Sequence, residues 1–213
     1  MPRRGDDPQV AQLKPIIGCD LDGVLYPFIT AARMYFHMRG FDVEVAVDAD
    51  THWDTLEEQV PKADWNEMWA SGRKEVFDSA AAYPGSIKAL KQIEQMCRIK
   101  YVTHRPRDVA HVTMNWMAKH KLNPYALMHV PGEPKGPHAA DCFAFIEDRP
   151  DNAIEVGRFL EGREENPGGI NENPVWVPRR PWNEGAFTDG EGYDIRVFDD
   201  WKEVVTWVRL MTS

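Results

Sequence analysis

Residues 16–25 read IIGCDLDGVL, a short apolar run that stops at two aspartates and a glycine. An apolar run of this length is typical of a strand that is buried on both faces of a parallel sheet. The carboxylates of Asp20 and Asp22 repel each other in such a setting unless a cation or a shared proton lies between them. An aspartate beside a divalent cation can act as a nucleophile, and a second one can carry a proton to and from a leaving oxygen. The stretch therefore indicates phosphoryl-transfer chemistry.

The tetrapeptide Asp-x-Asp-Gly at residues 20–23 also occurs in polar turns and in calcium-binding loops. Short motifs recur by chance, so residues 20–23 alone do not decide between a catalytic loop and a turn. A calcium loop needs further oxygen ligands at alternating positions, whereas residues 24–28 read VLYPF. The calcium interpretation is therefore the weaker one, and the rest of the chain has to decide.

The composition bounds the class of protein. The chain has 213 residues, 43% of them hydrophobic and 28% charged, which allows one main domain with a small insertion. No apolar stretch approaches the roughly 20 residues that span a bilayer. Residues 1–13 lack the apolar segment of a signal peptide and predict a flexible tail, so we expect a cytoplasmic protein without membrane contact. The net charge of −9 disfavours an extended nucleic-acid-binding surface.

Helical and strand-like patterns alternate along most of the chain. Residues 28–38 and 62–77 have helical spacing, and the absence of a convincing strand up to Tyr83 predicts a small helical cap at residues 28–83. The predicted later strands are residues 98–103, 126–130, 142–146, 175–177 and 196–198. We expect Ser86 to cap the helix that follows the insertion, and Asp199 or Asp200 to cap the last helix. The pattern predicts an α/β fold, a Rossmann-like parallel sheet with helices on both faces, in which residues 14–27 and 84–213 form the core.

Polar residues follow four of the predicted strands. They are Asp20 and Asp22, then Thr103, then Lys135 in a loop rich in proline and glycine, and then Glu147 and Asp148. Ligands bind at the carboxyl ends of parallel strands, so we expect these side chains to form one site.

This set resembles the four motifs of the haloacid dehalogenase superfamily of phosphatases, which here read CDLDGV, YVTHR, EPKG and FIEDRPDNA. The resemblance implies that Asp20 is the nucleophile and a magnesium ligand. It implies that Asp22 is the general acid and base, with its backbone carbonyl on the metal, and that Asp148 completes the metal site. Thr103 and Lys135 would bind the phosphoryl oxygens.

The resemblance leaves some neighbouring residues without a settled role. Glu147 stands where many members have Gly or Asp. Asp151 and Asn152 remain alternatives as supports of the metal site. His104 and Arg105 follow Thr103 directly at the expected catalytic edge, which makes His104 a candidate phosphate-binding residue and Arg105 a candidate substrate-binding residue.

A closer similarity is to the 5′(3′)-deoxyribonucleotidase branch and covers most of the chain from Ile16 onward. It rests on the insertion after Asp22, on Tyr83-Pro84-Gly85 at the end of the insertion, and on the segments RPWN at 180–183 and RVFDDW at 196–201. The resemblance implies a deoxynucleoside monophosphate substrate. We expect Phe28 and Trp53 of the cap to contact the base, although aromatic residues of a cap also serve as its packing.

Several alternatives stay open on the sequence. A phosphatase for another small phosphate ester needs the same residues, and a polynucleotide-end phosphatase is disfavoured by the acidic balance. A dehalogenase has no leaving oxygen to protonate and does not need Asp22. A catalytically idle binding module with this fold would have no need of all five motif residues. The oligomeric state is not readable, with a homodimer among the options.

Overall fold

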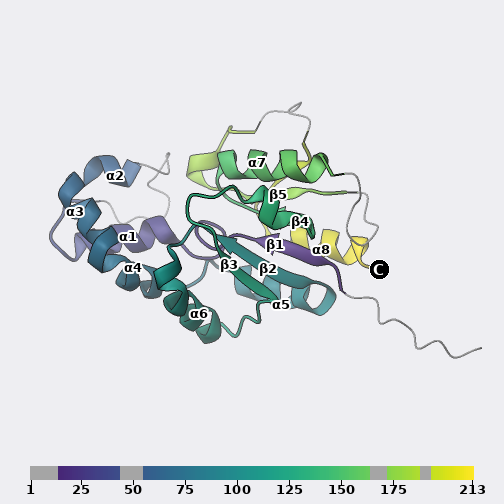
Figure 1. The fold of residues 1–213 in the computed structure, drawn as a ribbon, viewed down its shortest axis with the longest axis horizontal. Coiled ribbons are helices and arrows are strands. Elements are labelled where there is room, and N and C mark those ends of the chain that lie inside the picture. The colour runs from purple at the N-terminus through teal and green to yellow at the C-terminus, as the bar shows by residue number, and fades with distance from the viewer. Residues whose placement is uncertain (1–13, 44–54, 164–171, 188–192) are drawn as a thin grey trace, which may run out of the picture.

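The computed structural model describes residues 14–43, 55–163, 172–187 and 193–213. Within these residues, a six-stranded sheet has the order β3-β2-β1-β4-β5-β6, and every neighbouring pair is parallel (Figure 1). The strands are β1 Ile16–Cys19, β2 Arg98–Thr103, β3 Ala126–His129, β4 Cys142–Ile146, β5 Val175–Pro178 and β6 Ile195–Phe198. The prediction of a Rossmann-like α/β fold is confirmed.

Helices cover both faces of the sheet. Helices α5 (Ser86–Met96), α6 (Ala110–Lys119) and α8 (Trp201–Met211) contribute to one buried cluster, and α7 (Pro150–Glu161) to another. Successive strand residues point to opposite faces, so Ile17 belongs to the first cluster and Ile16 to the second. This double cover explains why the central strands read as unbroken apolar runs.

A group of helices follows β1 and lies at the left of Figure 1. It comprises α1 Phe28–His37, α2 Thr55–Gln59, α3 Lys62–Glu67, the π-helix Met68–Gly72 and α4 Arg73–Ser79. The helical cap inserted after the first strand is thus confirmed, and the sequence pattern missed α2 and the π-helix. Its limits at residues 28 and 83 stay a prediction. The expectations for the tail at residues 1–13 and for Trp53 lie outside the described residues.

The two ends of this insertion are held together at the edge of the sheet. The backbone N–H of Tyr83 donates to the carbonyl of Leu25 at 2.9 Å, and the N–H of Ala80 donates to the Tyr26 hydroxyl at 3.1 Å. The indole N–H of Trp116, on α6, donates to the carbonyl of Ala80 at 3.0 Å. These bonds fix the start of α1, and with it Phe28, beside the loop that follows β1.

Helix capping follows the sequence at one helix and departs from it at another. Of the two expected residues, Asp200 caps α8 and accepts from the Lys202 N–H at 2.9 Å. The expectation for Ser86 is wrong, because Gly85 occupies the N-cap position of α5 with φ +80°. Ser86 lies inside the helix and its hydroxyl donates back to the carbonyl of Tyr83 at 2.7 Å.

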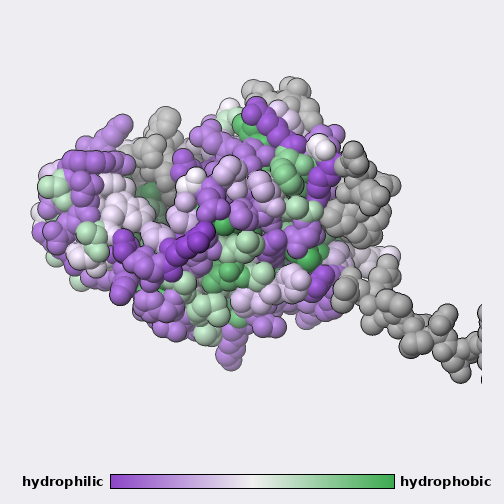
Figure 2. Space-filling model, in the orientation of Figure 1, coloured by the Kyte–Doolittle hydropathy of each residue, from purple (hydrophilic) through white to green (hydrophobic). Residues whose placement is uncertain are grey.

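The surface of the described residues gives no sign of a membrane span, since every helix is too short or too polar to cross a bilayer. Figure 2 shows hydrophilic residues predominating on the displayed face, with hydrophobic ones in several small separate patches, one of them over the region of β3. Such scattered apolar residues are ordinary on a protein surface. No observation tests whether the chain forms a homodimer.

Candidate active site

The loop after β1 folds back on itself and presents two aspartates. The Gly23 N–H donates to the carbonyl of Tyr26 at 2.8 Å, and the Tyr26 N–H donates to the carbonyl of Leu21 at 2.8 Å. The side chain of Asp20 is 7% exposed and that of Asp22 is 16% exposed. A short apolar strand followed by a tight turn thus places both carboxylates at the carboxyl edge of the sheet.

Gly23 allows this loop to approach the end of β4. Its φ of +78° is a conformation that side chains other than glycine rarely adopt, and a Cβ at this position would lie 1.9 Å from Oδ2 of Asp148. The loop and Asp148 can therefore be neighbours only because residue 23 has no side chain.

We expect Gly23→Ala to be more damaging than the same change at Gly40, which has φ +87° and open space around the position of a Cβ. The left-handed backbone costs roughly 1–2 kcal/mol at either glycine. Only at residue 23 must the carboxylate of Asp148 move as well. Chemical denaturation should therefore show a larger loss of unfolding free energy for Gly23→Ala, and phosphatase activity should fall only in that variant. Equal effects of the two changes would contradict the close approach.

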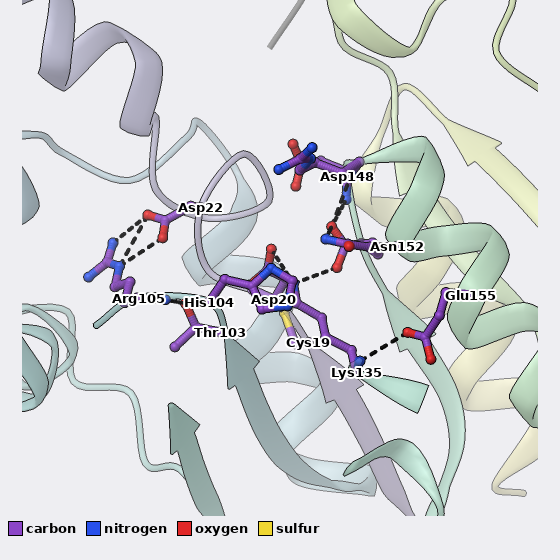
Figure 3. Close-up of polar contacts among 12 residues, drawn as sticks. Cys19, Asp20, Asp22, Thr103, His104, Arg105, Lys135, Asp148, Asn152 and Glu155 are labelled. Atoms are coloured by element: carbon purple, nitrogen blue, oxygen red, sulfur yellow. Dashed lines mark hydrogen bonds and ion pairs between the residues drawn. The ribbon is translucent and has the colours of Figure 1, made fainter. Parts of the chain in front are cut away.

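Lys135 is buried between two carboxylates. Its Nζ lies 2.8 Å from Oδ2 of Asp20 and 2.6 Å from Oε2 of Glu147. Glu155 of α7 accepts hydrogen bonds from the backbone N–H groups of Lys135 at 2.9 Å and Gly136 at 3.0 Å. Figure 3 shows Lys135 and Glu155 on one side of Asp20. Burial opposes the charged ammonium, but the charges of Asp20 and Glu147 outweigh it and raise the pKa of Lys135 above its ordinary value. The lysine is therefore a fixed positive charge beside the Asp20 carboxylate.

Three buried acids lie close together here. Carboxylate oxygens of Asp20, Glu147 and Asp148 fall within 4.8 Å of one another. Burial raises the pKa of Asp20 to about 7, and burial together with the charges of Glu147 and Asp20 raises the pKa of Asp148 well above its ordinary value. Oδ1 of Asp20 and Oδ1 of Asp148 are buried without a hydrogen-bond partner. Unpaired buried carboxylate oxygens are costly unless a cation binds them, so this donor set fits a divalent metal ion.

The geometry also gives Glu147 a role that the sequence left open. Its Oε2 faces Lys135, and its Oε1 accepts from the backbone N–H groups of Asp148 and Arg149, each at 3.1 Å. The side-chain amide of Asn152 donates to the same Oε1 at 3.4 Å, whereas Asp151 is exposed. Of the two alternatives, Asn152 is the one that contacts the acidic cluster.

Arg105 lines the pocket and forms an ion pair with Asp22. Its Nη2 is 2.7 Å from Oδ1 of Asp22, and its Nε is 2.9 Å from Oδ2 (Figure 3). The Arg105 side chain has no exposed surface, and its guanidinium lies 4.6 Å from the ring centroid of Tyr26 and 4.5 Å from that of Phe77. The sequence predicts that Arg105 binds the substrate, which no observation tests; in the structure its guanidinium donates to Asp22 and to the hydroxyl of Thr113.

Thr103 and His104 end β2 at the same edge. The Thr103 hydroxyl oxygen is fully buried and accepts from the Arg105 N–H at 3.2 Å. Nε2 of His104 lies 3.0 Å from the carbonyl of Glu133. Burial and the nearby charge of Lys135 lower the pKa of His104, which favours a neutral imidazole. The phosphate-binding role that the sequence predicts for both residues stays a prediction.

A pocket opens above these groups and has a polar floor and an aromatic wall. The polar lining comprises Asp20, Asp22, His104, Arg105, Lys135, Arg149 and Asn152. The aromatic lining comprises Phe28, Trp69 and Phe77, in which Phe28 stacks on Trp69 with 5.7 Å between ring centroids and on Phe77 with 5.4 Å. Trp65 stacks on Phe36 inside the cap at 6.0 Å, so it serves packing. The pocket is therefore formed by the sheet edge and the cap together.

The sequence did not predict a role in the site for four further residues. Glu155 holds the Lys135 loop, and Arg180, Trp182 and Asn183 contact the loop of Gly23 or Asp148. The signal for the last three was present in the segment RPWN directly after a predicted strand, at the same edge of the sheet as the acids. Their partners could not be read from sequence because the contacts span 34 to 157 residues.

A parallel sheet with two aspartates after β1, a lysine held against the first of them and an acidic end of β4 defines a phosphatase of the haloacid dehalogenase type. The sequence model of one family matches residues 14–158, which is more than half of the chain. The chain belongs to this family, described as 5′ nucleotidase, deoxy (pyrimidine), cytosolic type C protein. A comparison with individually curated proteins finds no match.

Solved structures of haloacid dehalogenase-like hydrolases share the fold. One from Deinococcus radiodurans, with bound phosphate and sodium, has a TM-score of 0.59 at 13% identity over 95% of this chain and 99% of the other. One from Streptococcus pneumoniae has a TM-score of 0.57 at 14% identity over 93% and 99%. One from Burkholderia xenovorans has a TM-score of 0.54 at 13% identity over 91% and 96%. These similarities bear on the fold.

Proposed function

We propose that the chain is a magnesium-dependent phosphomonoesterase that hydrolyses (deoxy)nucleoside monophosphates through an aspartyl-phosphate, in the manner of a 5′(3′)-deoxyribonucleotidase. One observation carries the proposal: Asp20, paired with Lys135 and clustered with Asp148, lies beside Asp22 at the floor of a pocket with an aromatic wall. The family description adds support for the nucleotide and for a cytoplasmic location.

Magnesium would be held by the carboxylates of Asp20 and Asp148 and by the backbone carbonyl of Asp22. The fit rests on the unpaired buried oxygens of Asp20 and Asp148 and on the preference of Mg²⁺ for carboxylate and carbonyl oxygens. When bound, the ion supplies positive charge that offsets the anionic acids and phosphate.

The first step is an attack by Asp20. A carboxylate oxygen of Asp20 forms a bond to phosphorus while the bond from phosphorus to the ester oxygen breaks. Protonated Asp22 gives its proton to the leaving oxygen, which departs as the alcohol of the nucleoside. The structure shows Asp22 bonded to Arg105, so its carboxyl has to turn from Arg105 toward the leaving oxygen in this step. Lys135, Thr103 and His104 bind phosphoryl oxygens and offset their charge.

The second step reverses the proton transfer. Asp22 takes a proton from a water molecule, and the water oxygen attacks phosphorus as the bond to Asp20 breaks. Inorganic phosphate leaves and the Asp20 carboxylate is restored. Asp22 has given up its proton in the first step, and in the structure Arg105 lies 2.7 Å from its carboxylate.

Phosphate release from a panel of nucleoside monophosphates and sugar phosphates, with and without Mg²⁺, tests the proposal. We expect hydrolysis of deoxynucleoside 5′- or 3′-monophosphates with a clear preference over phosphoglycolate, and none after chelation of the metal. Equal rates across the panel would favour a phosphatase for another small ester, and hydrolysis only of DNA or RNA ends would favour a polynucleotide-end phosphatase. No turnover of any phosphate would favour an idle binding module.

Phe28 gives a sharper test of the base-binding role. Stacking of a base on an aromatic ring is worth roughly 1–3 kcal/mol, and Phe28 lines the pocket at the start of α1. We expect Phe28→Ala to raise KM for nucleoside monophosphates about tenfold and to leave KM for phosphoglycolate nearly unchanged, since only the nucleotides have a base to lose contact with. Steady-state kinetics on both substrates measure the difference.

A control is needed because Phe28 is only 5% exposed and its loss leaves a cavity against Trp69 and Phe77. Phe36→Ala removes a buried ring from the same helix that does not line the pocket. This variant should be destabilised similarly but keep its KM values. Equal increases of KM for both substrates in Phe28→Ala would mean that the cap excludes water and does not contact the base.

A further inference from the structure

The segment Arg180–Asn183 follows β5 and lies outside the residues that the family model matches, which end at residue 158. It contains a short 3-10 helix, Pro181–Asn183, and reaches the two loops that carry the acids. Its contacts converge on Asp148 and on Gly23. We call this segment the C-terminal clamp.

The clamp holds Asp148 at two points. The indole N–H of Trp182 donates to Oδ2 of Asp148 at 2.9 Å. The side-chain amide of Asn183, which is 3% exposed, donates to the backbone carbonyl of Asp148 at 2.9 Å and to that of Pro178 at 3.0 Å. One carboxylate oxygen of Asp148 is thus occupied by Trp182, while Oδ1 is buried and unpaired.

The clamp also holds the loop on the other side of the acidic cluster. Nε of Arg180 donates to the carbonyl of Gly23 at 2.9 Å. The guanidinium of Arg180 stacks over the ring of Tyr83 at 3.9 Å from the centroid, which anchors it to the end of the cap. Gly23 and Asp148 approach each other closely, since a Cβ at residue 23 would lie 1.9 Å from Oδ2 of Asp148. Arg180 and Trp182 therefore hold the two loops at a point of close approach.

We propose that the C-terminal clamp positions the divalent-cation site, with Trp182 directing Asp148 so that Oδ1 is left for the ion and Arg180 fixing the loop of Asp20 and Asp22. The proposal rests on the metal site of the proposed function. Residues that hold a metal ligand by hydrogen bonds typically change metal affinity 10- to 100-fold when they are lost. Arg180 and Trp182 are therefore positioning residues that need not touch the substrate.

Trp182→Phe tests the clamp, because it removes the N–H donor and keeps an aromatic ring. We expect Mg²⁺ to bind about 10-fold more weakly in isothermal titration calorimetry, and the rise in melting temperature on adding Mg²⁺ to shrink accordingly. The melting temperature without metal should change little. At saturating Mg²⁺, KM for the phosphate ester should stay near that of the wild type. Arg180→Met should weaken Mg²⁺ binding in the same direction and serves as the second variant.

Trp207→Phe is the matched control. Trp207 lies on α8 and its indole N–H also donates to a carboxylate, Oε2 of Glu172, at 3.1 Å. This variant should bind Mg²⁺ as the wild type does.

Unchanged Mg²⁺ affinity in both Trp182→Phe and Arg180→Met would contradict the proposed role of the clamp. This holds even if the melting temperatures of the two variants fell, because residues that only pack against the loops would affect stability and not Mg²⁺ affinity. A wild-type protein that binds no Mg²⁺ would instead contradict the metal site itself, so failure of the proposed function is distinguishable from failure of the clamp.

Discussion

Asp20→Asn should reduce turnover of every phosphate ester by more than about 10³-fold while the protein stays folded. An amide oxygen is a far weaker nucleophile than a carboxylate, and asparagine cannot supply the charge that a metal ion needs beside Asp148. Phosphate release and single-turnover labelling with a ³²P-labelled substrate measure the loss. Labelled phosphate should be trapped on the wild-type chain after an acid quench but not on the variant.

The stability of this variant separates chemistry from folding. Burial raises the pKa of Asp20 to about 7, so ionised Asp20 lowers the free energy of unfolding at pH 8 in the metal-free protein. Asparagine removes this cost, and Lys135 keeps its contact with Glu147. The metal-free variant should therefore melt at the same temperature as the wild type or higher. Asp151→Asn, at an exposed position nearby, is the control and should be fully active.

A labelled phosphate on the chain, or near-normal turnover, in folded Asp20→Asn would contradict the nucleophile assignment. Loss of activity in Asp151→Asn as well would mean that any change of charge at this edge inactivates the protein. The comparison would then say nothing specific about Asp20.

The local elements could be read from sequence because each carries its own signal. The run CFAFI between polar residues predicted the strand that the structure places at Cys142–Ile146, and the pair Asp199-Asp200 predicted the start of α8. The π-helix at Met68–Gly72 and the positive φ at Gly85 leave no such periodic signal. They depend on what packs against them, as Tyr35 does at Gly72, where an added Cβ would lie 2.2 Å from the Tyr35 hydroxyl.

The candidate site was predictable to the extent that it consists of strand ends. Parallel strands bring their carboxyl ends to one edge, so the convergence of Asp20, Lys135 and Asp148 followed from the order of elements. What these residues bond to was not predictable. The partner of Asp22 turned out to be Arg105, 83 residues away, and the partner of Asp148 is Trp182. Such long-range contacts form only in the folded structure, and no local pattern of residues predicts them.

Asp22→Asn should lower kcat for nucleoside monophosphates by about 10²-fold or more, because the leaving nucleoside oxygen then has no proton donor. Asparagine keeps the shape and one acceptor oxygen for Arg105, so the loop should keep its conformation.

The effect of Asp22→Asn should depend on the leaving group. p-Nitrophenolate leaves without a proton, so its release from p-nitrophenyl phosphate should stay fast in the first turnover, while the second step still lacks its base. Stopped-flow absorbance should show a burst of nitrophenolate close to the enzyme concentration, followed by slow turnover.

Asp141→Asn is the matched control, because Asp141 is also ion-paired, with Lys100 at 2.7 Å, and directly precedes β4 at the opposite edge of the sheet. It should show neither the loss of kcat nor the burst. Equal losses on nucleotides and on p-nitrophenyl phosphate with no burst would place the defect of Asp22→Asn at the attack of Asp20. Asp22 would then serve to shape the loop against Arg105, and the proton would have to come from another group in the pocket.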